Sequence, residues 1–277
     1  MNNTLGSSEI HKLLDFAVEL AQDAGALTLK YFGGIVDADA KGDGSPVTVA
    51  DRNAEKLIRQ KIEERFPSDS ILGEEFGESN KGARVRWILD PIDATRSFTR
   101  GVPLFGVLIA VEVDGESVVG VAHFPALDET VAAGAGHGCT WNGELCHVSS
   151  VNSLSKAVVC TTDIERILAR PEGVGWRRLQ QRAAFSRTWG DCYGHALVAT
   201  GRIEAQVDPI MAPWDAGPFL TILTEAGGCF TTLQGEPTIH GGSGISSNGT
   251  LHEDILRELA SYANESTASI SRSVPVP

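Results

Sequence analysis

The sequence of 277 residues predicts a layered fold that joins an α+β half to an α/β half. Two helical patterns come first, a series of strand patterns separated by turn residues follows, and strands and helices alternate beyond a polar stretch near residue 150. We therefore expect an N-terminal α+β lobe over residues 1–150 and a C-terminal α/β lobe over residues 151–263. Residues 264–277 are rich in Ser, Thr and Pro and predict a flexible tail.

Two amphipathic helices open the chain. Apolar side chains recur every three or four positions over residues 8–32, where the pattern stops at Gly33. The second helix follows a polar loop that contains glycine, and Pro67 closes it. Thr48 or Asp51 is the expected N-cap, so helix capping alone would explain a carboxylate at Asp51.

The middle of the chain predicts an antiparallel sheet. Asp114-Gly115 and Asn142-Gly143 are turn sequences that supply the positive φ angles of tight hairpins. The apolar runs on either side of such turns are the expected strands, and they cover residues 104–113, 117–124, 129–133 and 139–141.

Strands and helices alternate in the second half, which is typical of an α/β layer. The expected strands are 158–161, 203–207, 229–233 and 244–247, and the expected helices are 173–183, 191–199, 214–226 and 250–262. Thr250 and Glu253 fit a capping box for the last helix.

The composition limits the classes of partner and compartment. A net charge of -13 argues against a nucleic-acid partner, because such binding depends largely on clustered Lys and Arg. The five cysteines are odd in number and form no C-x-x-C pair, so we expect reduced thiols in small core positions of a cytoplasmic protein. The longest apolar run, residues 102–111, is far too short to cross a membrane, and we expect no membrane partner.

Two aspartates interrupt the strand pattern that begins at Val85. Asp90 and Asp93 lie on either side of Pro91, which cannot continue a sheet ladder. The strand is expected to end at Leu89 and turn, which would leave both carboxylates at a strand tip.

Two further acids stand at the ends of segments. Glu74 follows a short apolar run, and Asp215 begins a helix beside Trp214. Each of these acids alone has a structural explanation as a turn or cap residue. Together, carboxylates from separate segments are the ligands that hard divalent ions such as Mg²⁺ prefer, and several of them can hold two ions.

The residues after Asp93 suit a phosphate group. Ala94-Thr95-Arg96 can begin a short helix to Arg100, whose first N–H groups would face an anion, and Thr95 adds a hydroxyl. Paired cations, N–H donors and a carboxylate are the equipment for hydrolysing a phosphate ester. Metal-free acyl transfer fits less well, because the sequence has neither a nucleophile elbow nor a paired Cys and His.

Four motifs in this order resemble the signature of the inositol monophosphatase-like family. They are Val47-Thr-Val-Ala-Asp51, Gly73-Glu-Glu75, Asp90-Pro-Ile-Asp-Ala-Thr95 and Trp214-Asp215. The resemblance spans roughly residues 8–262. It implies a layered αβαβα sandwich of the inositol monophosphatase / fructose-1,6-bisphosphatase type and a homodimer that uses two or three Mg²⁺ ions to activate water.

The resemblance also implies a set of metal ligands. Glu74 and Asp90, with the carbonyl of Ile92, would bind the first ion. Asp90, Asp93 and Asp215 would bind the second. Most of these ligands lie in the N-terminal lobe.

The catalytic and phosphate-binding roles follow from the same motifs. Glu74 and Thr95 would orient the attacking water, and Asp51 would support a third, weaker ion. Asp93, Ala94 and Thr95 would hold the phosphate, the last two through their backbone. The family usually has Gly where Ala94 stands; alanine keeps the N–H donor, and phosphate binding is retained if φ there is negative.

The substrate is expected to be a small phosphate ester, most simply histidinol phosphate. Residues 96–106 and 190–194 resemble the histidinol-phosphate phosphatase branch of the family. Asp191 and Asp208 would face the cationic leaving group, and Arg96 would also contact the substrate. Capping explains Asp191 and Asp208 equally well, and a neutral polyol could bind Asp208.

Other interpretations of the same residues stay open. An inositol 1-phosphatase or a broad sugar or nucleotide phosphatase is the enzyme alternative, and a non-catalytic binding protein on this fold is the other. His123 and His195 lie in apolar surroundings and receive no role.

Overall fold

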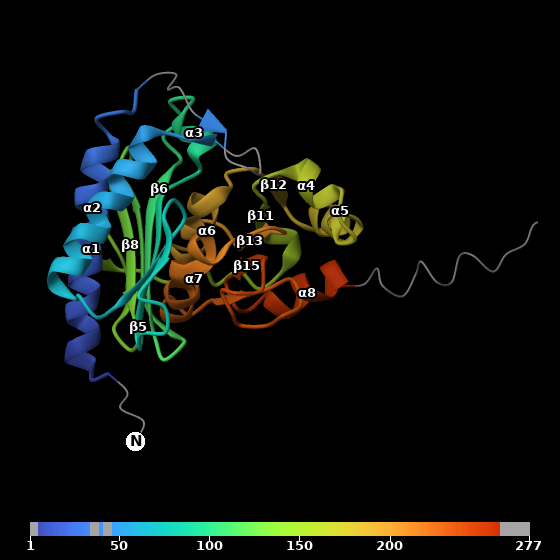
Figure 1. Ribbon diagram of the computed structural model, residues 1–277. Helices are drawn as coiled ribbons and strands as arrows, with labels where there is room; N and C mark the ends of the chain where they lie inside the picture. The colour runs from blue at the N-terminus through green and yellow to red at the C-terminus, as the bar shows by residue number, and fades with distance from the viewer. Residues whose placement is uncertain (1–4, 34–38, 41–45, 261–277) are drawn as a thin grey trace, which may run out of the picture.

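Five layers make up the protein in the computed structural model, which describes residues 5–33, 39, 40 and 46–260. Figure 1 shows them from left to right as a helix pair, a large sheet, a second helix pair, a smaller sheet and a last group of helices. The tail expected at residues 264–277 lies outside the described residues. None of the helices in the described ranges is both long and apolar enough to cross a membrane.

The first layer consists of α1 (Ser7–Thr28) and α2 (Val49–Arg65), which pack on one face of the large sheet. The first helix ends four residues earlier than expected. The N–H groups of Lys30 and Tyr31 donate to carbonyls three residues back instead of four, so the α-helical hydrogen-bond pattern stops there. Thr48 is the N-cap of α2, since its Oγ1 accepts from the Ala50 N–H at 3.1 Å.

The large sheet has eight strands in the order β10-β9-β8-β7-β6-β5-β3-β4. Their bounds are β3 (Ser70–Gly73), β4 (Gly77–Ser79), β5 (Val85–Asp93), β6 (Gly106–Val113), β7 (Glu116–Phe124), β8 (Glu129–Gly134), β9 (Gly138–Trp141) and β10 (Glu144–Leu145). All neighbours are antiparallel except β3 and β5. The expected hairpins are therefore present, while β4 was not predicted, because three polar residues carry no strand pattern.

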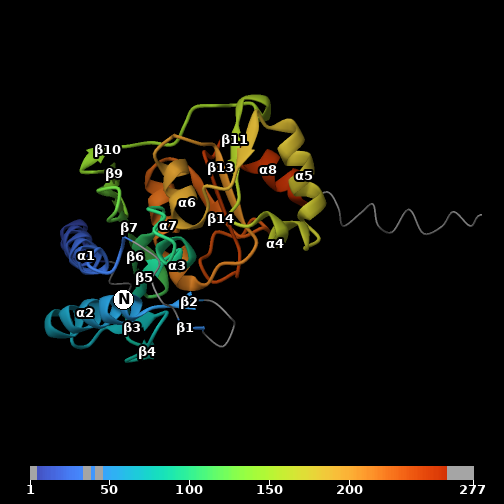
Figure 2. The same ribbon diagram turned by 90° about the horizontal axis from the view of Figure 1, so that it is seen from above.

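Helices α6 (Asp191–Ala199) and α7 (Pro213–Glu225) form the middle layer and contact both sheets. Figure 2 shows them between the two sheets from above. Gly120 on β7 makes the close approach of α7 feasible, because a Cβ there would lie 2.1 Å from the Pro218 carbonyl oxygen. The apolar cluster between the sheets includes Phe124, Phe219 and Phe230.

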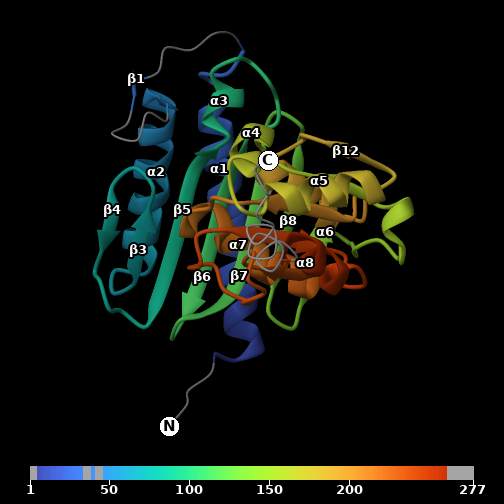
Figure 3. The same ribbon diagram turned by 90° about the vertical axis from the view of Figure 1, so that its right-hand side faces the viewer.

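The smaller sheet has five strands in the order β12-β11-β13-β15-β14. Their bounds are β11 (Val158–Cys160), β12 (Phe185–Arg187), β13 (Ala205–Asp208), β14 (Cys229–Thr231) and β15 (Gly244–Ser247). The last layer, which faces the viewer in Figure 3, contains α5 (Gly173–Arg182) and α8 (His252–Ala260), with α4 (Ile164–Leu168) beside α5. The short elements α4 and β12 were not predicted.

The last helix begins differently from the expected capping box. It starts at His252, and the side-chain oxygen of Asn248 accepts the Leu251 N–H at 3.1 Å in place of a bond from Thr250. The turn at Asn248-Gly249 therefore determines the helix start.

Candidate active site

The strand β5 continues through Pro91 to Asp93, so the expectation that it ends at Leu89 is wrong. Asp90 pairs with Leu108 and Asp93 with Gly106 on β6, which leaves a bulge between the two aspartates. A bulge leaves a residue outside the ladder, so Pro91 sits where its missing N–H costs no sheet bond. The extra residue turns both aspartates toward the same end of the sheet.

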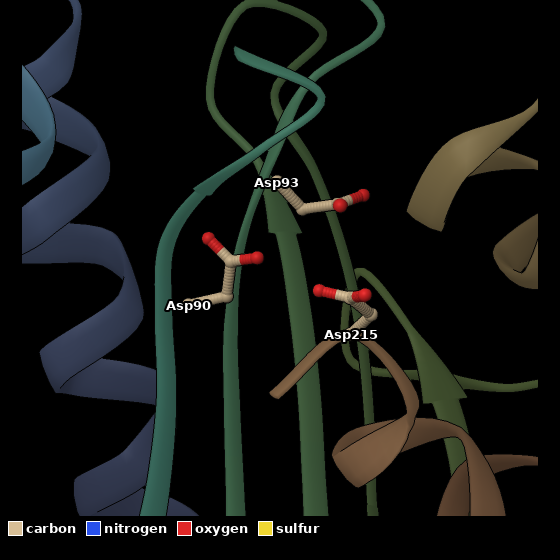
Figure 4. A group of neighbouring side chains, drawn as sticks. All are labelled: Asp90, Asp93 and Asp215. Carbon is tan, nitrogen blue, oxygen red and sulfur yellow. The ribbon is translucent and has the colours of Figure 1, made fainter. Parts of the chain in front are cut away.

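Asp90, Asp93 and Asp215 come together at this end. Each offers one carboxylate oxygen, and these oxygens all lie within 4.8 Å of one another. Figure 4 shows the three side chains converging, two from the β5 end and one from the start of α7. Glu74 lies outside this close set but lines the same cavity.

Backbone N–H groups hold the three carboxylates in place. Asp90 accepts from Ile92 at 3.0 Å, Asp93 from Cys192 at 2.7 Å, and Asp215 from Ala212 at 2.7 Å. The bond to Cys192 joins the end of β5 to the first turn of α6. The two halves of the chain thus orient the cluster jointly.

Burial and mutual repulsion raise the pKa values of the three carboxyl groups in this cluster. Burial, and then the charge of Asp215, raises the pKa of Asp93 to about 7. Burial also raises the pKa of Asp215 to about 7, against the opposing effect of the Ala212 N–H. The pKa of Asp90 is raised by burial and then by the charge of Glu74. Hard oxygen donors gathered this closely fit a divalent cation.

A residue outside the sequence motifs fixes the backbone next to Glu74. Glu55 on α2 is fully buried, and it accepts the N–H groups of Glu75 at 2.7 Å and Phe76 at 3.2 Å. A Cβ at Gly73 would lie 2.0 Å from the Glu55 carboxylate, so a larger residue there would displace that carboxylate from the two N–H groups. The sequence signal for this role was an acid on the buried face of an amphipathic helix.

Thr95 and Asp51 meet beside the cluster. The Thr95 hydroxyl donates to the Ile92 carbonyl at 3.0 Å and lies 3.4 Å from an Asp51 carboxylate oxygen. Asp51 is fully buried and accepts the Thr48 N–H at 2.8 Å, which completes the capping box of α2. Burial raises the pKa of Asp51 despite these bonds.

Ala94 adopts the left-handed conformation, with φ 66° and ψ 44°, so the condition of a negative φ is not met. It is the N-cap of α3 (Thr95–Phe98), which is shorter than the expected helix to Arg100. Within the described part of the chain, the N–H groups of Ala94, Thr95 and Arg96 have no hydrogen-bond acceptor. The donors are therefore present, in a backbone shape that glycine adopts more easily.

The cleft has two adjoining parts. The smaller, about 160 Å³, holds the acidic cluster and the chain from Ile92 to Arg96. The larger, about 280 Å³, is bordered by Asp208, Met211 and Trp214. Asp191 lines both parts and stands at their junction.

Asp191 has an unusual backbone conformation and a raised side-chain pKa. Its φ is +50°, and its N–H donates to the Thr162 hydroxyl at 2.6 Å. Burial, followed by the charges of Asp93 and Asp208, raises the pKa of Asp191 to about 8. A cation beside this half-buried carboxylate would favour its ionised form.

Asp208 is engaged by the protein itself. One oxygen accepts the Thr162 N–H at 2.9 Å, and the other accepts from Gln206 at 2.7 Å and lies 3.1 Å from His195 Nε2. Burial opposes its ionisation, but His195 and the other donors lower the pKa of Asp208 overall. His195, which the sequence left without a role, also contacts Ser246 at 2.7 Å and so fixes Asp208 in the cleft wall.

Comparison with known proteins places this cleft in a family. A sequence profile described as the inositol monophosphatase family matches residues 9–264. The chain belongs to the inositol monophosphatase family. A histidinol-phosphatase of Chlorobaculum parvum is 47% identical over 245 residues, covering 88% of this chain and 95% of that protein. A histidinol-phosphatase of Mycobacterium tuberculosis is 36% identical over 261 residues, covering 90% and 98%.

Solved structures agree with the assignment to the inositol monophosphatase family. The Thermotoga maritima IMPase superposes with a TM-score of 0.82 at 31% identity, covering 92% of this chain and 99% of that chain. The predicted resemblance and the layered fold are thus confirmed, and the protein is a phosphatase of this family.

The family motifs did not point to every residue of the cleft. Arg166 on α4 is exposed, lines both parts of the cleft and lies 3.4 Å from Asp163. Arg96, which was expected to contact substrate, is exposed at the edge of the smaller part. Both guanidinium groups favour the ionised form of Asp191 and so act to lower its pKa. No sequence signal marked Arg166, because the short helix that carries it has no clear periodicity.

Proposed function

We propose that this phosphatase hydrolyses histidinol phosphate with Mg²⁺ as its cofactor. The observation that carries the proposal is the position of Asp191, a half-buried carboxylate between the acidic cluster and the larger part of the cleft. A substrate with its phosphate at the cluster would place its leaving group beside Asp191. The names of the two histidinol-phosphatase relatives support a cationic leaving group.

The acidic residues divide into two ligand sets in this proposal. Glu74 and Asp90, with the Ile92 carbonyl, would hold one ion, and Asp90, Asp93 and Asp215 would hold the second. Mg²⁺ bound there would supply a Lewis acid that offsets the charge of the phosphate and lowers the pKa of water. The close approach of three carboxylate oxygens supports the second set.

The remaining residues would hold and orient the reactants. The N–H groups of Ala94 and Thr95, which have no acceptor within the described residues, would donate to phosphate oxygens. Glu74 and the Thr95 hydroxyl would orient the attacking water, and buried Asp51 would position that hydroxyl and support a third ion. Arg96, at the cleft edge, would attract the phosphate dianion.

The larger part of the cleft would receive the leaving group. Asp191 would accept hydrogen bonds from the ammonium group of histidinol. The positive charge of that group would stabilise the ionised form of Asp191, which burial and the neighbouring aspartates disfavour. Trp214 and Met211 offer an apolar wall for the imidazole ring. Asp208 would contribute its charge and would need to keep its internal bonds to His195 and Gln206.

Phosphate release from four esters tests the proposal: histidinol phosphate, inositol 1-phosphate, a sugar bisphosphate and adenosine 3′,5′-bisphosphate. We expect the highest kcat/KM for histidinol phosphate, loss of activity in EDTA and recovery with Mg²⁺. A higher kcat/KM for inositol 1-phosphate would reject this substrate in favour of the inositol alternative. Absence of turnover on all four, with Mg²⁺ binding measured by calorimetry, would instead identify a non-catalytic binding protein.

A further inference from the structure

A pair of cysteines lies at the edge of the large sheet, away from the cleft. In the hairpin of β9 and β10, Glu144 pairs with Trp141 and Leu145 with Thr140, so the next opposed pair is Cys146 and Cys139. The Cys146 N–H donates to the Cys139 carbonyl at 3.0 Å. The two Sγ atoms are 3.5 Å apart.

This geometry suits a covalent bridge. Opposed residues of an antiparallel pair have Cα atoms about 4.5 to 5.5 Å apart, and disulfides span Cα separations of about 4.4 to 6.8 Å. The sulfurs need to approach by only about 1.5 Å to reach a bond length near 2.05 Å. Elsewhere in the described ranges, no other pair of thiols shares a hydrogen bond.

The two thiols differ in access and reactivity. Cys139 is fully buried, whereas Cys146 is half-buried. The hydrogen bond shared with Cys139, and to a smaller extent the positive charge of Arg202, lowers the pKa of Cys146 against the opposing effect of burial. Arg202 is held nearby by an ion pair with Glu129 at 2.9 Å. Cys146 is therefore the thiol that an oxidant in solution would meet first, and as the better nucleophile.

We propose that Cys139 and Cys146 are a modification site, at which a peroxide converts the two thiols into an intramolecular disulfide. The Cys146 thiolate attacks one peroxide oxygen, the O–O bond breaks, and a sulfenic acid and, after protonation, one water form. The Cys139 sulfur then attacks Cys146 Sγ. The S–O bond breaks, and the leaving hydroxide takes the Cys139 proton as a second water.

The disulfide would stabilise the hairpin of β9 and β10, which lies away from the active site. Three strands, β8, β7 and β6, lie between β9 and β5, which carries Asp90 and Asp93. Figure 2 shows β9 and β10 on the side of the sheet opposite β3 and β4. The chain beyond Cys146 passes the C-terminal end of α7, where the Val148 N–H donates to the Ala226 carbonyl at 3.1 Å. Oxidation is thus expected to stiffen the edge strand and leave kcat and KM unchanged.

Peptide mapping of the full chain after treatment with hydrogen peroxide tests this site. Remaining thiols are alkylated in denaturant, and the protein is digested without reductant. We expect loss of two of the five thiols, one peptide pair that joins Cys139 to Cys146, and reversal by dithiothreitol. The thermal midpoint should rise by a few degrees, because a closed loop lowers the entropy of the unfolded chain.

Two serine variants provide the comparison. Cys146→Ser should prevent the bridge, whereas Cys229→Ser, which changes another half-buried thiol outside the pair, should leave it intact. Conversion of Cys146 to a sulfinic acid with Cys139 still open to alkylation would overturn the proposal. So would a cross-link between other cysteines. Peptide mapping of the native sequence separates these outcomes even if a variant folds poorly.

Discussion

Replacing Ala94 by glycine isolates the cost of its backbone conformation. At φ 66° an L-residue carries about 1–2 kcal/mol of strain that glycine avoids. Glycine in turn raises the entropy of the unfolded chain, which costs about 0.4–1 kcal/mol. We therefore expect Ala94→Gly to raise the free energy of unfolding by about 0.5–1 kcal/mol. In a domain of roughly this size, each kcal/mol of stabilisation raises Tm by about 2–4 °C.

Urea unfolding measured by circular dichroism checks this value. Ala26→Gly is the matched control, because Ala26 is exposed on α1 in the ordinary helical conformation. This control should lose about 0.5–1 kcal/mol, opposite in sign to Ala94→Gly. Since the N–H at residue 94 is kept, kcat/KM should change little. Equal destabilisation by the two substitutions would refute the assigned strain, and a large loss of kcat/KM would show that the alanine methyl group matters.

Four further outcomes are expected. Glu55→Gln should lower the free energy of unfolding by about 1–3 kcal/mol, by weakening buried charged hydrogen bonds, and should lower kcat through Glu74; urea unfolding and steady-state rates measure both. Asp93→Asn should abolish turnover but keep the native circular dichroism spectrum; a near-normal kcat would contradict its assignment as a ligand. Between about pH 4 and pH 7, Asp93 and Asp215 hold protons in the metal-free folded protein that they have already released in the unfolded chain, because their pKa values are raised on folding. The free energy of unfolding should therefore fall as pH rises through this range. The slope should be at most about 1.4 kcal/mol per pH unit for each of the two protons. Unfolding in EDTA tests this slope, and calorimetry should find Mg²⁺ affinity rising over the upper part of that range. Asp191→Asn should reduce kcat/KM for histidinol phosphate about tenfold or more and spare neutral esters; equal losses on both would remove it from the leaving-group site.

The sequence was informative where chemistry resides in single residues at the ends of segments. Asp90, Asp93 and Asp215 could be picked out because each interrupts or begins an apolar pattern, and the structure brings these three together. The Asp-Gly and Asn-Gly turn sequences likewise predicted the hairpins. Such signals are local, so one chain suffices to see them.

The features that escaped prediction depend on partners distant in sequence. Pro91 stays within β5 because the register with β6 shifts beside it, and a register belongs to two strands. The left-handed turn at Ala94 follows from that bulge and the start of α3. The periodicity of α2 places Glu55 on its buried face, but the role of Glu55 depends on the contact with the turn after β3, which the pattern of one helix does not contain.

The attachment of Asp215 to α7 has a consequence for biosynthesis. As the chain leaves the ribosome, β5 emerges with Asp90 and Asp93 long before the helix that carries the third carboxylate. Helix α7 must also dock on β5, β6, β7 and β8 to bring that carboxylate into place. A nascent N-terminal half therefore exposes an incomplete acidic cluster. An ion that prefers all three oxygens would favour the docked state and draw the late helix onto the early sheet.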